Sequence, residues 1–418
     1  MTEPQPRTVP WALVLLLILA MVVCYAHRGA LSIAAPFMMK ELGLRPATMG
    51  VLLSAFFWLY AFMQVPAGWI VDRFGVKWAY AGGFAFWSMA SALTGFAQGA
   101  MSLIGLRLAL GVGQSVAFPA SASAVSRSFR DRERGLVTAG YLSGVRIGQA
   151  IVGAIGAVMI AKYGYRGFFL IISLTALLWL IPWMAFWSRS QLALRHPGSP
   201  AAVPSAYFSF RDAVLLLRHR TVLGIFLGYF AYDYVWFVYV TWLPSYLIVG
   251  RKFTTAEMGF YSSVPYLIMM VVILMSGALS DYVIRRGRAE RAVRKWFIAV
   301  GMLVACLIVP AGLVEDRVTS VWLLTAALMG IGIASPNTWT LTQVVCARPI
   351  VGTVSGIQNF GGNLGGIVAP ALTGYTVSSS GSFGVPFVVC GVVLVVGVLC
   401  YWLLVSEHVE MQTEAIAR

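Results

Sequence analysis

Long apolar stretches, separated by short polar segments, constrain the fold of this chain more than any other feature. Each spans about 20 residues, the length that an α-helix needs to cross the hydrocarbon core of a bilayer. Hydrophobic residues make up 59% of the 418 residues and charged residues 11%, whereas charged residues are about 25% of a typical soluble domain. A water-soluble fold could not cover so much apolar surface, so the sequence predicts an all-α membrane protein. The twelve expected transmembrane helices are 11–37, 49–71, 78–98, 101–126, 136–161, 167–187, 221–247, 256–280, 296–314, 320–345, 350–376 and 383–406.

A short motif occurs twice, half a chain apart, and indicates an internal duplication. The first copy consists of Gly68, Asp72, Arg73, Gly75 and Lys77, and the second of Gly277, Asp281, Arg285, Arg286 and Gly287. Each copy follows one apolar stretch and precedes another, as expected for two similar bundles of six helices. We therefore predict an N-terminal six-helix bundle in residues 1–187 and a C-terminal six-helix bundle with a short cytoplasmic tail in residues 221–418. The polar segment 188–220 is expected to be a cytoplasmic linker.

The distribution of positive charge predicts the orientation of the chain in the membrane. There are 30 Lys and Arg residues against 15 acidic ones, an excess that in a soluble protein would raise the question of nucleic acid. Here most of the basic residues fall at the first end and in the even-numbered connections between apolar stretches. Because cytoplasmic loops carry the excess of Lys and Arg, both termini are expected in the cytoplasm. The short external loops and Arg-rich composition favour the inner (cytoplasmic) membrane of a bacterium.

Features of enzymes and metal proteins are missing from the sequence. The five cysteines show no paired spacing and are expected to be buried free thiols. There is no His-Glu-x-x-His site, acidic metal cluster or sizeable extramembrane domain. We therefore predict no cofactor and no metal site, and a membrane-embedded enzyme is the weaker hypothesis.

Five further stretches are typical of one group of membrane transporters. They are residues 25–32 (YAHRGALS), 57–68 (FWLYAFMQVPAG), 107–119 (RLALGVGQSVAFP), 241–247 (TWLPSYL) and 355–366 (SGIQNFGGNLGG). With the paired loop motif, they resemble the major facilitator superfamily over nearly the whole chain. More narrowly, the chain resembles the anion:cation symporter family, which includes bacterial sugar-acid and aromatic-acid transporters and the animal sialins.

The resemblance implies a central substrate cavity between the two bundles, opened alternately to each side of the membrane. It also implies that Arg28 binds a substrate carboxylate, assisted by Tyr25 and Tyr60. In the proton-coupled members an Asp precedes that arginine, and a Glu follows the fourth-helix arginine by seven residues. This chain has His27 and Gln114 at those two positions, so both familiar proton carriers are missing and the resemblance does not carry over the usual coupling scheme.

Three arginines are expected inside the membrane, where a charged side chain costs at least about 2.5–3.5 kcal/mol. Arg28 is interpreted as an anion site, with a structural arginine satisfied by backbone carbonyls as the alternative. Arg107 either stabilises the fold or one conformer, or contacts substrate. Arg146 either faces the cavity or extends toward the membrane surface. Gln114 cannot carry a proton and is expected to orient substrate.

Asp233 is the carboxylate expected deepest in a span, and with His27 it is a candidate for proton coupling. For Asp233 the alternative is a fixed ion pair across the two bundles, and for His27 a simple hydrogen bond. Tyr229 and Trp236 share a helix face with Asp233 and are candidate substrate contacts. The remaining candidates are the chain's three asparagines, whose alternative role is hydrogen bonding between helices. They are Asn337, Asn359 and Asn363.

The repeated loop motif is interpreted as a conformational gate. Asp72 is expected to cap a neighbouring helix or to pair with an arginine near residues 131–134, and so to hold one side shut. The residues assigned to this gate are Gly68, Asp72, Arg73, Arg134, Gly277 and Asp281.

These observations predict a secondary transporter that carries a small organic anion, a sugar acid or related carboxylate, by alternating access with proton symport. The alternatives are a uniporter, an exchanger or a sodium-coupled carrier of monocarboxylates or aromatic acids. A transporter-like sensor that binds ligand without net uptake is a further alternative. We expect a monomer in the lipid bilayer with no nucleic-acid partner.

Overall fold

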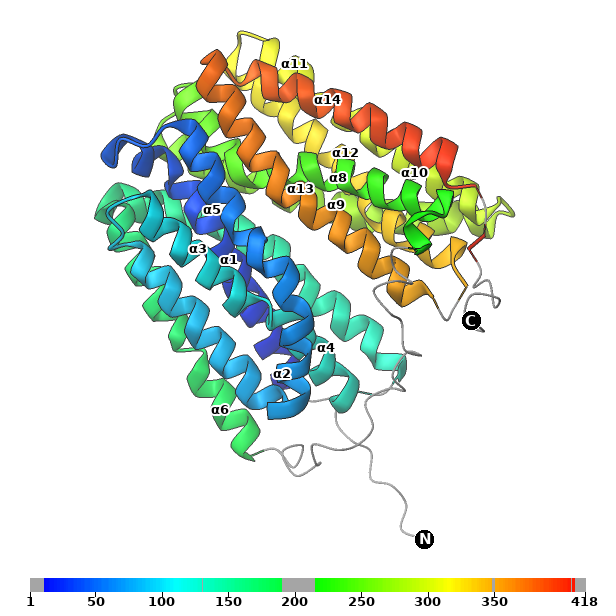
Figure 1. Ribbon diagram of the computed structural model, residues 1–418, viewed down its shortest axis with the longest axis horizontal. Coiled ribbons are helices and arrows are strands. Elements are labelled where there is room, and N and C mark those ends of the chain that lie inside the picture. The colour runs from blue at the N-terminus through cyan, green and yellow to red at the C-terminus, as the bar shows by residue number, and fades with distance from the viewer. Residues whose placement is uncertain (1–10, 130, 190–214, 348–349, 407, 410–418) are drawn as a thin grey trace. The chain divides into compact units, whose positions relative to one another are not determined.

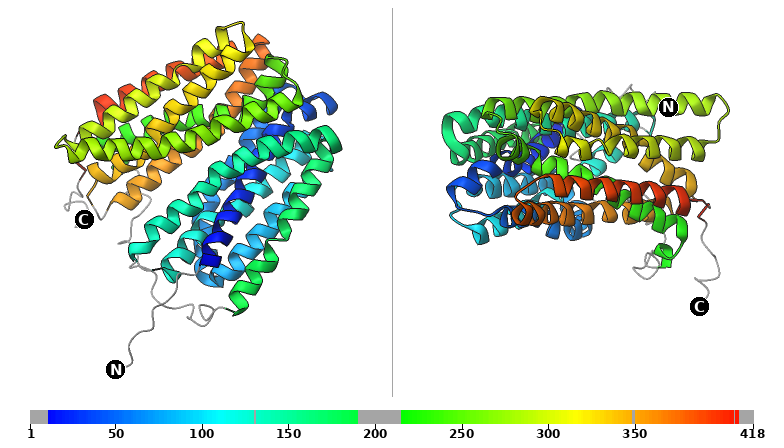
Figure 2. Two further views of the ribbon diagram at one scale, coloured as in Figure 1. Left: turned by 180° about the vertical axis from the view of Figure 1, so that it is seen from behind. Right: turned by 90° about the horizontal axis from the view of Figure 1, so that it is seen from above.

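The computed structural model describes residues 11–129, 131–189, 215–347, 350–406 and 408–409. Within these residues the chain is helical, and the one β-type pairing is an isolated bridge between Cys346 and Val409. The predicted all-α class is therefore confirmed. The helices run side by side in two compact units (Figures 1 and 2).

The first unit comprises Met1–Ala34 and Trp58–Ser199, and the second comprises Ala35–Phe57 and Pro200–Arg418. Two long helices, α1 (Trp11–Glu41) and α2 (Pro46–Thr94), contribute residues to both units. The domain boundaries expected from the sequence stay a prediction. Residues 190–214 of the expected linker lie outside the described part of the chain.

The other helices of the first unit are α3 (Ala100–Gln114), α4 (Ala117–Ser128), α5 (Asp131–Leu177) and α6 (Leu180–Arg189). Both α2 and α5 are interrupted by one glycine in the left-handed region. These are Gly75, with φ 77° and ψ 156°, and Gly164, with φ 69° and ψ 170°. Because residues with a Cβ rarely adopt such backbone angles, glycine permits a sharp turn at each position. Each of these long helices is therefore two helical segments joined by a turn.

The second unit contains the remaining helices, and α8 and α12 each pack against several of the others (Figure 1). They are α8 (Arg220–Ser245), the π-helix η2 (Tyr246–Gly250), α9 (Thr255–Arg285), α10 (Glu290–Ala305), α11 (Ile308–Leu313), α12 (Arg317–Val345), α13 (Val351–Ser380), α14 (Gly384–Leu399) and the π-helix η3 (Cys400–Leu404). The closest pairings are α13 with α8, and α12 with α10 and α9.

The helices have the length and hydropathy of membrane spans. Nine stretches of the described residues meet both criteria, and one of them, Val137–Ser188, runs across the Gly164 turn and so holds two spans. The second half of α2 and the whole of α13 are not among these stretches, although each is a helix long enough to cross a bilayer, and they complete the set. Twelve spans result within the described chain, as the apolar stretches predicted.

Two kinds of contact hold the first unit together. Phe84 of α2 stacks on Trp179 with ring centroids 4.3 Å apart. The Trp179 indole N–H donates to the Leu16 carbonyl oxygen at 3.0 Å, which joins α2 and the turn before α6 to α1. Gly144 and Gly148 of α5 lie directly against the backbone of α1. A Cβ at residue 148 would come within 2.4 Å of the Val22 carbonyl oxygen. Small residues one turn apart therefore let the two helices approach closely.

Candidate functional site

Arg28 lies in the middle of α1 inside the first unit and is 8% exposed. Its guanidinium carbon is 4.4 Å from the ring centroid of Tyr25 and 4.7 Å from that of Tyr60. The Arg28 Nε donates to Gln114 Oε1 at 3.2 Å, and Gln114 Nε2 donates to the Cys24 carbonyl oxygen at 2.8 Å. Because that second bond leaves Oε1 facing Arg28, Gln114 fixes the guanidinium between two aromatic rings.

The sequence-predicted residues Tyr25, Tyr60 and Gln114 are thus all brought to Arg28. Gln114 contacts the arginine itself, a role that the sequence did not predict. The three partners come from α1, from α2 and from the end of α3.

Arg107 and Arg146 lie in the same region of the first unit. Arg107, on α3, is 4% exposed and is near enough to Arg28 for their charges to interact. Arg146, on α5, is half-buried and interacts electrostatically with Tyr25. Since Gly144 and Gly148 flank Arg146 in sequence, the close approach of α1 to α5 also brings Arg146 toward the Tyr25 and Arg28 pair. Three positive charges therefore gather in one bundle.

His27 is adjacent to Arg28 in sequence but makes a different contact. It is 1% exposed, and its Nε2 lies 3.3 Å from the carbonyl oxygen of Ile172 on α5. Because a carbonyl oxygen only accepts, that nitrogen carries the proton. The geometry matches the alternative that the sequence left open, a histidine held by a hydrogen bond between helices.

Asp233 lies on α8 in the second unit, with its carboxylate directly over Gly362 of α13. A Cβ at residue 362 would be 2.1 Å from Asp233 Oδ2 and 2.8 Å from Tyr229 Cε1. Asp233 also interacts electrostatically with Tyr229 and with Tyr401 of η3. Glycine at 362 is therefore required for the carboxylate to occupy this position, and tyrosine rings from two elements surround it.

The other aromatic candidates of α8 are buried and packed. Tyr229 is 6% exposed, stacks on Tyr232 with centroids 5.4 Å apart and meets the edge of Trp339. Trp236 is 7% exposed and makes an edge contact with Tyr266 at 5.9 Å. Tyr229 lies beside Asp233.

The three asparagines do not form one cluster. Asn337 is fully buried, accepts from Arg294 at 3.2 Å and donates to Ser276 Oγ and to the Ile333 carbonyl. Asn363 donates to the Asn359 carbonyl oxygen of its own helix at 3.0 Å, and the Asn359 side chain is half-buried. We therefore assign Asn337 to an internal network of α9, α10 and α12.

Arg294 is the centre of that network, although it falls in the connection between the expected helices 256–280 and 296–314. It is 6% exposed, and its two terminal nitrogens donate to Ser280 Oγ at 2.7 Å, to Asp281 Oδ1 at 2.6 Å and to Glu290 Oε1 at 3.3 Å, besides Asn337. The spacing of Glu290 and Arg294, one helical turn, was the available signal. The second copy of the repeated motif is therefore tied to α10 and α12 through Asp281.

The first copy of the motif is bound more loosely. Asp72 pairs with Arg127 of α4 at 3.5 Å, and the two side chains are 63% and 41% exposed. Arg134, in the expected partner segment, donates to the Ser126 and Phe129 carbonyls at the end of α4. The pairing of Asp72 with an arginine near residues 131–134 stays a prediction. Arg73 lies over the ring of Trp69 at 5.5 Å.

Gly68 and Gly277, the two glycines assigned to the gate, have open space around them. Gly68 has no neighbouring atom within 4 Å of a Cβ placed on it, and Gly277 meets only Pro336 Cβ, at 4.0 Å.

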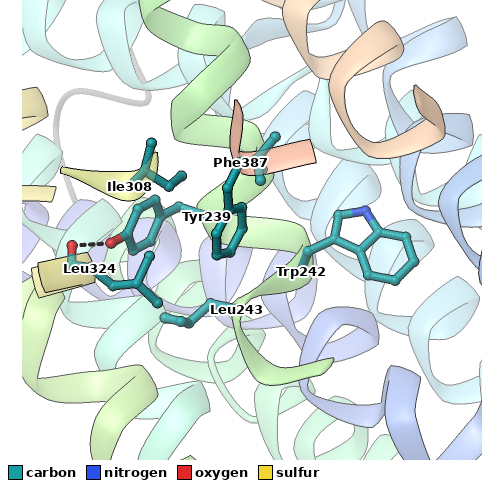
Figure 3. Close-up of a pocket in the computed structure, with 7 residues that line it drawn as sticks. Tyr239, Trp242, Leu243, Ile308, Leu324 and Phe387 are labelled. Atoms are coloured by element: carbon teal, nitrogen blue, oxygen red, sulfur yellow. Dashed lines mark hydrogen bonds between the residues drawn. The ribbon is translucent and has the colours of Figure 1, made fainter. Parts of the chain in front are cut away.

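A hydrophobic pocket inside the second unit is not suited to an anion (Figure 3). It is lined by Val238, Tyr239, Trp242, Leu243, Ile308, Leu324 and Phe387. The Tyr239 hydroxyl donates to the Leu324 carbonyl, and the Trp242 indole N–H donates to the Pro370 carbonyl oxygen at 3.0 Å. With its polar groups already bonded and no charged lining residue, the pocket offers nothing that would hold a carboxylate.

Comparison of the sequence with known protein families identifies the family of this chain. The model of the Major Facilitator Superfamily matches residues 17–370 and 289–417. The chain belongs to the Major Facilitator Superfamily. It is therefore a membrane transporter and not an enzyme, and the fold expected from the sequence is confirmed.

Two curated relatives and one solved structure illustrate the similarity. The chain is 30% identical to the D-galactonate transporter of Escherichia coli O6:H1, over 94% of each chain. It is 29% identical to the probable galactarate/D-glucarate transporter GarP of Escherichia coli K12, over 97% of this chain and 96% of the relative. The crystal structure of a bacterial homolog of the human lysosomal transporter Spinster matches with a TM-score of 0.80 at 16% identity, covering 96% of this chain and 98% of the other.

Proposed function

We propose that this transporter carries a sugar acid or related carboxylate across the bacterial inner membrane by alternating access with proton symport. The observation that carries the proposal is Arg28, buried mid-helix and held between Tyr25 and Tyr60 by Gln114. Both termini are proposed to be cytoplasmic and the protein monomeric, on the basis of the loop charges and of the superfamily resemblance.

The chemistry of the guanidinium supports an anionic substrate. Its planar fork matches the two oxygens of a carboxylate, and competition from water weakens as the group becomes buried. The tyrosine rings hold the guanidinium in position, so little side-chain freedom is lost when the anion arrives. Tyrosine hydroxyls in addition suit the hydroxyl groups of a sugar acid. The similarity to galactonate and galactarate/D-glucarate carriers points to the same class.

Asp233 is the proposed proton carrier. A carboxylate inside a membrane bundle is less costly to bury when it is protonated, and the Gly362 position holds this one among tyrosine rings. His27 is less suited, since its ring is bonded to the Ile172 carbonyl.

Reconstitution in proteoliposomes tests the anion site. We expect the wild type to accumulate galactonate or galactarate when the outside is made acidic, and Arg28→Ala to lose both uptake and counterflow. Arg28→Lys keeps the charge without the fork and should weaken binding. Lack of both uptake and counterflow by the wild type with every sugar acid would contradict the proposal. Ligand that stabilises the protein against heat without counterflow would indicate a sensor.

Asp233→Asn tests the coupling separately. This variant should retain counterflow, which needs no proton gradient, and lose uphill accumulation. Glu257→Gln, which changes an exposed carboxylate at the start of α9, is the matched control and should behave as the wild type. Accumulation driven by sodium, or no accumulation with either gradient, would favour the sodium-coupled or uniport alternatives.

A further inference from the structure

The balance of charge inside the membrane carries information about the substrate. Among the described residues, four charged side chains lie well inside the spans. Three are positive, Arg28, Arg107 and Arg146, and one is negative, Asp233. With Asp233 ionised the net charge is two positive units, and with Asp233 protonated it is three. This count does not depend on which arginine, if any, Asp233 meets. A protonated His27 would only add to the excess.

The positive charges are also gathered in space. Arg107 interacts with Arg28, and Arg146 interacts with Tyr25, whose ring lies against Arg28. Like charges repel, and the repulsion is strong where little water screens them. The cluster is therefore under electrostatic stress that a bound anion relieves.

We propose that the transported species is a dianion with two acid groups joined by a short polar chain, such as an aldarate. This inference rests on the proposed function and specifies its substrate. A monoanion at Arg28 leaves at least one excess positive charge in the membrane interior, which is costly. A dianion brings the count to zero with Asp233 ionised and to one positive unit with Asp233 protonated. Arg28 takes one acid group, and Arg146 with Arg107 takes the other, so Arg146 determines specificity.

Sequence similarity does not decide this question. The identity to a galactonate carrier is 30% and to a galactarate/D-glucarate carrier 29%, although the first substrate has one carboxylate and the others have two. The two classes of relative are equally close, whereas the charge balance distinguishes their substrates.

A matched pair of substrates tests the proposal. Galactonate and galactarate share a six-carbon hydroxylated chain and differ at one end, where galactarate has a carboxylate in place of a hydroxymethyl group. The measurement is the concentration of each that half-inhibits counterflow in proteoliposomes at neutral pH. We expect galactarate to act at a concentration at least tenfold lower.

Variants assign the second acid group. Arg146→Gln should reduce the preference for galactarate at least tenfold and leave galactonate competition nearly unchanged. Lys162→Gln removes one positive charge from an exposed position of the same helix and should leave the ratio as in the wild type. Arg107→Gln is the second variant, and a lower ratio there with an unchanged one in Arg146→Gln would overturn the assignment to Arg146.

The wild-type comparison decides the substrate class even if a variant does not fold. Equal or stronger competition by galactonate overturns the dianion proposal while the sugar-acid function stands. Counterflow of neither compound, nor of any other sugar acid, indicates instead that the proposed function has failed.

Discussion

Gly148 makes the contact on which the arginine cluster depends, and replacing it by alanine tests that dependence. The new Cβ would lie 2.4 Å from the Val22 carbonyl oxygen and 3.1 Å from the Val22 Cα and carbonyl carbon. Carbon and oxygen normally approach only to about 3.3–3.6 Å. Since every one of these atoms is backbone, no side-chain rotation removes the clash, and α1 must move away from α5 by about 1 Å.

Two opposing effects determine the magnitude. Overpacking a tight contact costs about 1–3 kcal/mol, and a rigid backbone neighbour favours the upper part of that range. Alanine in a helix interior is favoured over glycine by about 0.5–1 kcal/mol. We therefore expect Gly148→Ala to lower the free energy of unfolding by about 1–2 kcal/mol. The same displacement should weaken sugar-acid binding, because it moves Arg28 and Tyr25 relative to Arg146.

Gly140 supplies a matched control on the same helix. A Cβ there would meet only side-chain atoms, Ile18 Cδ1 at 3.8 Å and Val14 Cγ1 at 3.9 Å. Gly140→Ala should therefore be neutral or stabilise by up to about 1 kcal/mol. Unfolding of both purified variants in detergent, followed by heat or by denaturing detergent, gives the comparison. Equal stability of the two variants would refute the argument that backbone contact at Gly148 seats α1.

Three further predictions concern the ends of the helices. Asp72→Asn should change the transport rate far more than the substrate affinity, and should change stability by less than about 1 kcal/mol because its pair with Arg127 is exposed; unaltered turnover in counterflow would contradict the gate. Arg294→Met should lower the free energy of unfolding by about 1–3 kcal/mol, since it removes buried charge-assisted hydrogen bonds to Asp281 and others, and a denaturation midpoint equal to the wild type would contradict this. Hydrogen bonds from the side chain and backbone of Thr319, the third residue of α12, lower the pKa of Asp316 in the folded protein. The ionised Asp316 side chain therefore stabilises the fold fully above its unfolded-state pKa, and this stabilisation is lost as the pH falls through its folded-state pKa. Thermal unfolding of Asp316→Asn should therefore show a smaller loss of stability toward acid pH than the wild type, and identical acid profiles would argue against the cap.

Much of the site was predictable because the family resemblance identified individual residues. The apolar pattern of the sequence then predicted the helix in which each of these residues lies. Arg28 with Tyr25, Tyr60 and Gln114 was expected around one substrate group, and the four do meet. What the sequence could not supply was the partner of each polar group, because partners come from helices far apart in the chain.

Asp72 illustrates the limit. Its carboxylate pairs with Arg127, and Arg134 donates to the carbonyl groups that end α4, two contacts that the motif itself did not name. Arg294 illustrates the same limit. The sequence pattern placed this basic residue in a connection between helices, whereas the structure buries it among α9, α10 and α12.

The sequence by itself determined the twelve helical spans, the turns between them and the superfamily, because a bilayer demands about 20 apolar residues for each crossing and that demand is local. It also determined the charge carried into the membrane, with three arginines and one aspartate. Only the tertiary structure decided that the arginines gather in one unit, that Asp233 rests on Gly362 and that His27 binds a carbonyl. Those outcomes depend on how closely two helix backbones approach and on which faces they present to each other. Such contacts depend on two helices together, so the sequence of one helix does not determine them.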